Sequence, residues 1–163
     1  MALNIRPVEP RDFAELADLL NAIIRAGGTT APEEEYSPEK LGEAYLIGPS
    51  VLFCHVAEDD ATGRLEGFQT MGLYPGLPDG YGNIATFSRM DGVQRGVGSA
   101  LFRMTLKIAK AQGLSGINAT IRADNSGGLT YYSKMGFTDF SVDEAVPLSD
   151  GTPIDRVHKR LAI

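Results

Sequence analysis

The chain has 163 residues, 43% of them hydrophobic and 22% charged, which is the composition of a globular domain with one sizeable core. A net charge of -6 at pH 7 argues against a nucleic acid or a membrane held by a basic patch, although backbone amides can still bind an anion locally. Cys54 is the only cysteine, and the chain shows neither a signal-peptide pattern nor the roughly 18 apolar residues of a transmembrane helix, so we expect a cytoplasmic protein without an intrachain disulfide.

The first half of the sequence predicts a strand, two helices and a hairpin. Apolar residues recur at helical spacing from Phe13 to Ile24, and Gly27 follows as a stop. Ser37 before Pro38 is typical of a capped helix start. The expected elements are a strand over 3–8, helices over 13–26 and 38–48, and paired strands over 51–57 and 65–74.

The second half begins with a loop rich in Gly and Pro over 76–82 and then alternates strands with helices. Apolar residues four and three positions apart, from Val97 to just before Gly113, predict an amphipathic helix. The expected elements are a strand over 84–90, a helix over 97–111, a strand over 116–122, a helix over 126–135, and strands over 137–142 and 154–163. This order, with hairpins at both ends, favours an α/β (α+β) fold with a mixed sheet and helices on both faces.

Residues 92–102 read GVQRGVGSALF, and Gly96 and Gly98 stand directly at the start of the helical pattern. Backbone amides at such a helix start can bind a phosphate. A P-loop is not supported, because GxxxxGK[ST] does not occur in the chain. A dinucleotide fingerprint is not supported either, because the third glycine of GxGxxG and the following acidic residue are missing. A plain strand-to-helix turn remains possible at this point.

The same segment fits the pattern Gln/Arg-x-x-Gly-x-Gly/Ala of loops that bind the pyrophosphate of coenzyme A, with Val93 in place of Gln or Arg. A second segment at 125–137, NSGGLTYYSKMGF, follows after one helix and one strand. It matches the pattern Asn-x-x-Ala-x-x-x-Tyr-x-x-x-Gly-Phe at Asn125, Tyr132, Gly136 and Phe137, with Gly128 in place of alanine. Over essentially its whole length the chain thus resembles the GNAT superfamily of acyl-coenzyme-A-dependent N-acetyltransferases.

The resemblance implies a single N-acetyltransferase domain over 1–163. Its central sheet would be mostly antiparallel, with two parallel strands, 84–90 and 116–122, that splay apart. The implied reaction moves the acetyl group of acetyl-CoA to a primary amine of a small molecule or a protein, by direct attack in a ternary complex. An alternative interpretation is a catalytically weak sensor or interaction domain that binds CoA or acyl-CoA. Nucleic-acid and membrane partners are not expected, and the family allows a homodimer.

The resemblance also implies a donor site. Backbone groups of Ser88, Arg89 and Met90 are expected to pair with the pantetheine arm like an added strand. Asn125 is expected to hydrogen-bond the same arm, to cap the following helix, or to do both. The amides expected to hold the pyrophosphate are those of Gln94, Arg95, Gly96, Val97, Gly98 and Ser99. The Arg95 side chain either adds positive charge there or is solvated.

Tyr132 is the expected catalytic residue, because a phenol beside the sulfur can donate a proton to the departing thiolate. Its neighbour Tyr131 points about 100° away on a helix and is expected to pack in the core or to contact the adenine. The residues expected around the acceptor are Thr29, Thr30, Tyr36, Tyr74 and Phe87. Residues 19–34, LLNAIIRAGGTTAPEE, are slightly similar to acetyltransferases of the phosphinothricin type and others that act on small amines, which does not assign a substrate.

A protein base for the attacking amine is in doubt. The strand NIATFSRM before the glycine loop lacks the glutamate that some family members carry there. Glu58, Asp91 and the acidic run over 33–35 are candidates, and each is also explained as a solvated surface charge. The His, Cys and Asp residues show no metal-ligand spacing, so no metal is expected.

Overall fold

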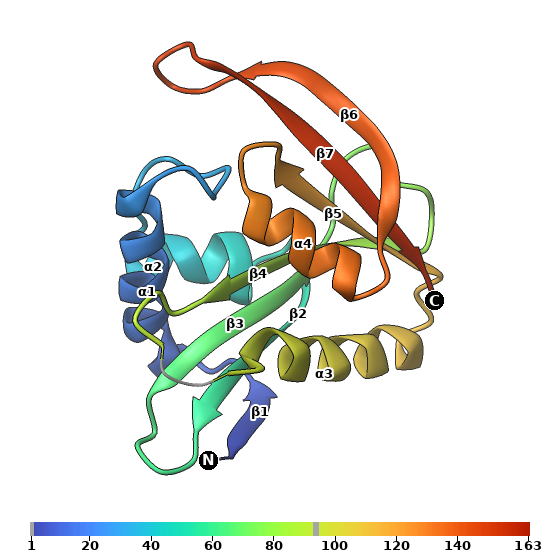
Figure 1. Ribbon diagram of the computed structural model, residues 1–163. Helices are drawn as coiled ribbons and strands as arrows, with labels where there is room; N and C mark the ends of the chain where they lie inside the picture. Colours follow the sequence, from blue (N-terminus) through green and yellow to red (C-terminus); the bar gives the residue numbers. More distant parts are fainter. Residues whose placement is uncertain (1, 93–94) are drawn as a thin grey trace.

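A computed structural model describes residues 2–92 and 95–163, which form one mixed sheet flanked by helices (Figure 1). The seven strands among these residues lie in the order β1-β2-β3-β4-β5-β7-β6. The strands are β1 (Leu3–Pro7), β2 (Val51–Asp59), β3 (Leu65–Gly72), β4 (Tyr81–Ser88), β5 (Gly116–Arg122), β6 (Thr138–Pro147) and β7 (Pro153–Ala162). The helices are η1 (Pro10–Asp12), α1 (Phe13–Ala26), α2 (Pro38–Leu41), η2 (Gly42–Leu46), α3 (Val97–Ala111) and α4 (Ser126–Lys134).

The predicted fold class is confirmed. Neighbouring strands in the sheet run antiparallel, except β4 and β5, which run parallel. β4 begins at Tyr81, inside the expected loop, because Tyr81 pairs with Gly116. The Tyr81 ring also covers that glycine, where a Cβ would overlap the ring Cζ. β6 continues to Pro147, beyond its expected end, because its residues are mostly exposed and no apolar alternation marks its length.

Helices cover both faces of the sheet, and each face has its own core (Figure 1). On one face Leu16 of α1 packs in a cluster with Phe68 of β3. On the other face Phe102 of α3 and Tyr132 of α4 pack in a cluster with Met71 of β3. Phe68 and Met71 are three positions apart on one strand, so their side chains face opposite sides. Among the helices of the described residues, none has the length and apolarity to cross a membrane.

The parallel strands β4 and β5 separate partway along their length, as expected. Their register runs only from Tyr81 opposite Gly116 to Ile84 opposite Ala119. The backbone N–H of Arg89 donates to the carbonyl oxygen of Glu66 in β3 at 2.8 Å. In an antiparallel pair, alternate residues direct their N–H and C=O groups toward the same neighbouring strand. The backbone groups of Ser88 therefore point away from β3, toward the gap between β4 and β5.

Candidate active site

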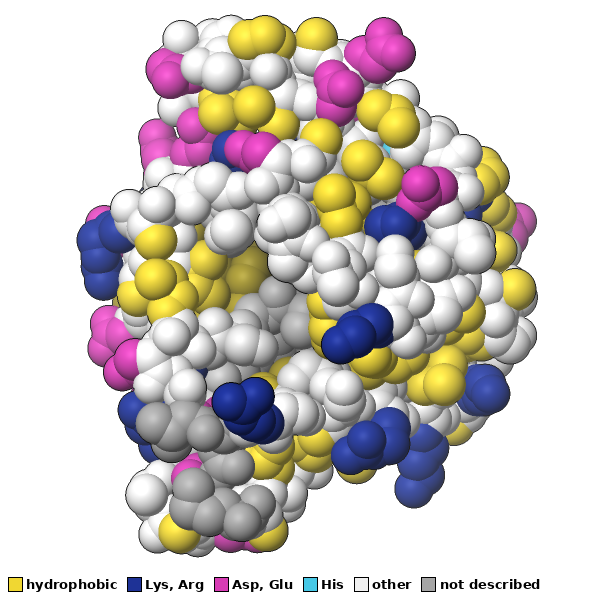
Figure 2. Space-filling model, viewed as in Figure 1, with side chains coloured by type: hydrophobic (Ala, Val, Ile, Leu, Met, Phe, Trp, Pro, Cys, Tyr) yellow, Lys and Arg dark blue, Asp and Glu magenta, His cyan; other side chains and the backbone are white. Residues whose placement is uncertain are grey.

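A cavity of about 720 Å³ lies where β4 and β5 separate. Figure 2 shows this face of the molecule hollowed, with hydrophobic side chains in the wall of the hollow. The predicted site residues that line the cavity are Thr29, Thr30, Tyr36, Tyr74, Phe87, Ser88, Gly98, Asn125 and Tyr132. Those that do not line it are Arg89, Met90, Arg95, Gly96, Val97 and Ser99. Gln94 and Val93 lie outside the described residues.

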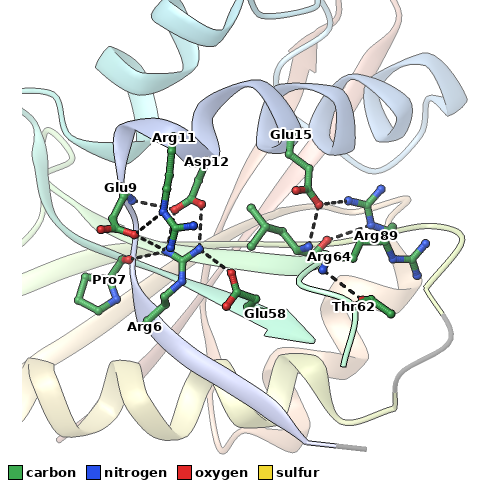
Figure 3. A network of polar contacts seen from close by, with 11 residues as sticks. Arg6, Pro7, Glu9, Arg11, Asp12, Glu15, Glu58, Thr62, Arg64 and Arg89 are labelled. Carbon is green, nitrogen blue, oxygen red and sulfur yellow. Dashed lines mark hydrogen bonds and ion pairs between the residues drawn. The ribbon is translucent and has the colours of Figure 1, made fainter. Parts of the chain in front are cut away.

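The side chain of Arg89 points toward Glu15 of α1 rather than into the cavity (Figure 3). Its guanidinium donates to a Glu15 carboxylate oxygen and to the Leu65 carbonyl oxygen, each at 2.9 Å. Arg89 therefore joins β4 to β3 and α1. Met90 beside it is 61% exposed. Of the three residues expected beside the pantetheine arm, Ser88 is the one in the cavity wall.

The two positions at the start of α3 are occupied by glycine for different structural reasons. Gly96 caps the helix with a φ of 78°, a left-handed conformation that glycine adopts without strain. At Gly98 a Cβ would lie 2.7 Å from Cε1 of Tyr131, so a larger residue does not fit against that ring. The N–H of Ala100 makes the first intrahelical bond, to the Gly96 carbonyl oxygen at 2.9 Å. The amides of residues 97–99 therefore have no acceptor within the helix.

Two adjacent tyrosines of α4 line the cavity. The Tyr132 side chain is buried, and its Oη lies 2.8 Å from Oγ1 of Thr86 in β4. Tyr131 packs against the core, as expected, and its hydroxyl also donates to the carbonyl oxygen of Gly98 at 2.8 Å. Burial raises the pKa of both phenols, so each stays protonated at neutral pH. The Thr86 contact was not predicted, because no sequence motif marks this threonine.

Asn125 caps α4, as one of its two expected roles requires. Its Oδ1 accepts a hydrogen bond from the Gly128 N–H at 3.0 Å, and its Nδ2 donates to the Thr29 carbonyl oxygen at 3.1 Å. A Cβ on Gly128 would lie 2.5 Å from the Asn125 Nδ2. This close approach explains the glycine at a position where the family pattern has alanine.

The ionic side chains in the cavity wall are basic. Arg122 and Arg156 are among the described lining residues, and no Asp or Glu is. Arg122 pairs with Asp124 at 2.7 Å, whereas no ion pair joins Arg156 to another described residue. The sequence patterns did not single out either arginine. The position of Arg122 at the carboxyl end of a parallel strand is the signal that could have found it.

The carboxylates considered as bases have other surroundings. Glu58 accepts a hydrogen bond from Arg6 at 2.9 Å (Figure 3). Glu33 accepts one from the Ser149 hydroxyl at 2.8 Å, and the Asp91 side chain is 76% exposed. These three residues are absent from the described cavity lining. In the described part of the chain, no group of three or more His, Cys, Asp or Glu residues could hold a metal ion.

The chain is similar to known proteins over nearly its whole length, although no family model matches it. It is 28% identical over 156 residues, 94% of each sequence, to YwnH of Bacillus subtilis (strain 168), a candidate phosphinothricin acetyltransferase. The crystal structure of a candidate phosphinothricin N-acetyltransferase is 24% identical, with a TM-score of 0.84 over 99% of this chain and 98% of the other. A GNAT superfamily phosphinothricin acetyltransferase from Sinorhizobium meliloti, in complex with AcCoA, is 16% identical, with a TM-score of 0.83 over 100% of this chain and 89% of the other.

The solved structures show that the fold is shared. The sequence match to YwnH extends over the same length. The glycine pair lies at the start of α3 and the tyrosine pair lies on α4. The chain thus shares its fold with acetyltransferases, one of them of the GNAT superfamily, and its sequence is similar to that of a candidate phosphinothricin acetyltransferase.

Proposed function

We propose that the protein transfers the acetyl group of acetyl-CoA to a primary amine. The observation that carries this proposal is the buried Tyr132 hydroxyl in the wall of the cavity between β4 and β5. The amine attacks the thioester carbonyl carbon directly in a ternary complex, and the carbon–sulfur bond breaks. Tyr132 then donates its proton to the departing thiolate. Burial raises the pKa of Tyr132, which keeps the phenol protonated until the sulfur becomes anionic.

The donor is proposed to lie along the gap in the sheet. The backbone of Ser88 faces this gap and supports pairing with the pantetheine arm as an added strand. The amides of residues 97–99, which have no acceptor within α3, support binding of the pyrophosphate, with the helix dipole adding to the attraction. Asn125 lies in the same wall and adds a polar side chain.

The cavity favours an acceptor that carries an acidic group besides its primary amine. Arg156 and Arg122 lie opposite each other in the β5–β7 register, at one side of the cavity. A cationic peptide would meet the positive charge of Arg156 there, whereas a carboxylate or phosphinate can pair with this guanidinium, which no ion pair joins to another described residue. Because the described lining residues include no carboxylate, the amine is proposed to lose its proton to water.

Two measurements in sequence test the proposal. Acetyl-CoA is first titrated calorimetrically into the protein, and thiol release is then followed with a panel of amines. The panel pairs acidic amines, beginning with phosphinothricin, with neutral amines of similar size and with lysine peptides. We expect binding, and faster thiol release with the acidic amines.

The same measurements separate the alternative function. Binding of acetyl-CoA without thiol release on the whole panel would support a weakly catalytic sensor of CoA or acyl-CoA. Absence of binding would contradict both functions. Faster release with lysine peptides than with acidic amines would contradict the proposed role of Arg156.

A further inference from the structure

We infer that Gln69 of β3 is a positioning residue that acts through Thr86 and leaves the Tyr132 proton free to be donated. The inference rests on the proposed acetyl transfer and concerns how the proton reaches the sulfur. Gln69 does not line the cavity and belongs to neither sequence motif. It is fully buried, directly opposite Thr86 in the register of β3 and β4.

One amide group of Gln69 connects both tyrosines. Its Nε2 donates to Oγ1 of Thr86 at 2.9 Å and to Oη of Tyr131 at 3.1 Å. Thr86 in turn lies 2.8 Å from Oη of Tyr132. A primary amide has two N–H hydrogens, so these two bonds use both of them.

The direction of these bonds follows from Gly98. Its carbonyl oxygen can only accept, so the Tyr131 hydroxyl must donate to it. Tyr131 has a single hydroxyl hydrogen, and it can therefore only accept from Gln69. This fixes the Nε2 side of the Gln69 amide toward the hydroxyls. The proton of Tyr131 is thus committed to Gly98 and is not available to the sulfur.

The second branch leaves the Tyr132 proton free. Thr86 accepts from Gln69 and has one hydroxyl hydrogen, which it can donate to Oη of Tyr132. Tyr132 can then direct its own hydrogen into the cavity. After the proton has left, the Thr86 hydroxyl still donates to the phenolate oxygen and stabilises its charge. Gln69 thus sets the donor direction along the branch to Tyr132, whereas the Gly98 carbonyl sets it at Tyr131.

The other side of the Gln69 amide supports a functional role. Its Oε1 is buried and has no hydrogen-bond partner among the described residues. An unpaired buried carbonyl destabilises a fold, and an apolar side chain of similar length would avoid that cost. Retaining glutamine here is explained if its two donated bonds serve the reaction, since departures of this kind occur at functional sites.

The test is a kinetic cycle with Gln69→Met and Tyr132→Phe. Methionine keeps the length of the side chain and removes both donors. We expect Gln69→Met to lower kcat about tenfold, a part of the effect of a general acid, and to change the KM for acetyl-CoA by less than about twofold. The double variant should be no slower than Tyr132→Phe, because Gln69 acts through Tyr132. An unchanged kcat in Gln69→Met, or effects that multiply in the double variant, would overturn the inference.

Two further variants distinguish the positioning role of Gln69 from the general effect of removing a buried polar group. Thr105 of α3 is buried, and its hydroxyl has no partner among the described residues, so Thr105→Val should leave kcat and KM unchanged. Thr86→Val breaks the link between Gln69 and Tyr132 and should lower kcat as Gln69→Met does. If Gln69→Met does not fold, Thr86→Val takes its place in the kinetic cycle. A normal kcat in Thr86→Val would contradict the inference.

A nuclear magnetic resonance measurement tests the hydrogen-bond network without relying on the proposed acetyl transfer. With carbon-13 at Cζ of the tyrosines, Gln69→Met should shift the resonances of Tyr131 and Tyr132 and leave that of Tyr74 in place. Unshifted resonances would show that the network does not exist. Wild-type protein that binds acetyl-CoA without thiol release would instead overturn the proposed function, and with it the proton transfer that Gln69 is inferred to position.

Discussion

Two polar networks of the molecule are built from different chemical groups. The network around Arg6 is ionic, with two bonds of 2.8 Å to Asp12 and one of 2.9 Å to Glu58 (Figure 3). The network around Gln69 is neutral and joins the hydroxyls of Thr86 and of the two tyrosines. The ionic network connects β1, η1 and β2, whereas the neutral network lies against the cavity.

The difference in chemistry indicates different functions for the two networks, with ion pairs stabilising the fold and neutral hydroxyls supporting proton transfer. Opposite charges at close range hold three segments of the chain in place and resist any change of protonation. Neutral hydroxyls can each accept and donate, so a proton can leave one of them while the others keep their hydrogen bonds. We therefore expect substitutions in the ionic network to change stability, and those in the neutral network to change the reaction.

Removing the centre of the ionic network should have the largest effect on stability. Arg6→Met leaves the Asp12 carboxylate, which is 5% exposed, without its charge partner. We expect the free energy of unfolding to fall by about 3 kcal/mol, the lower end for a broken buried pair, because Arg6 itself retains 14% exposure. Urea unfolding measures this loss.

A matched control lies five residues away. The Arg11 side chain is 65% exposed and pairs with Glu9, so Arg11→Met should cost less than about 0.5 kcal/mol. Equal losses in the two variants would contradict the importance assigned to the buried pair.

A smaller effect is expected from overfilling the edge of the neutral network. Gly98→Ala places a Cβ against the ring of Tyr131, at 2.7 Å from Cε1 unless the ring moves. The free energy of unfolding should fall by about 1–3 kcal/mol, as in other overpacked sites, and acetyl-CoA should bind more weakly.

Gly127→Ala is the control for this substitution, because its Cβ would meet only Asn125 Oδ1, at 3.8 Å. Inside α4 the change should stabilise the fold by about 0.5–1 kcal/mol. The two alanine variants should therefore change the free energy of unfolding in opposite directions. A change in the same direction for both would contradict the expected overpacking at Gly98.

The smallest expected effect is a pH dependence of the ionic network. Burial of Asp12 opposes its ionisation, but hydrogen bonds from Arg6 and from the Glu9 backbone, with the charge of Arg6, bring its pKa below the ordinary value. A pKa lowered by folding adds stability above the ordinary carboxyl pKa of about 3.9, and this stability is lost as the pH falls through the folded value.

Comparison with Asp12→Asn isolates this contribution. The difference in unfolding free energy between the wild type and this variant should be constant near neutral pH and should narrow as the pH falls below about 4. A difference that widened on acidification would show that the sign is wrong.

Much of the fold followed from local patterns. Helical spacing between Phe13 and Ile24 and between Val97 and Gly113 marked the two long helices, and the motif spacing placed Tyr132 on α4. These features depend on neighbours within a few turns of the chain. They were therefore visible before any tertiary contact was known.

The rest depends on how strands pair. Gln69 meets Thr86 only because β3 and β4 are in one particular register, and it meets Tyr131 across 62 positions of sequence. Arg156 enters the cavity because β7 pairs with β5 in a register that places Arg156 opposite Arg122. A slip of one residue would turn each of these side chains to the opposite face, and no local pattern specifies the register.

The central claim is that Tyr132 delivers a proton to the sulfur of acetyl-CoA. The most direct test measures both acetyl-CoA affinity and the transfer rate at saturation in Tyr132→Phe, which keeps the ring and removes only the hydroxyl. We expect the rate to fall by about a hundredfold or more, with little change in affinity. A collapse of affinity with the rate at saturation retained would contradict it.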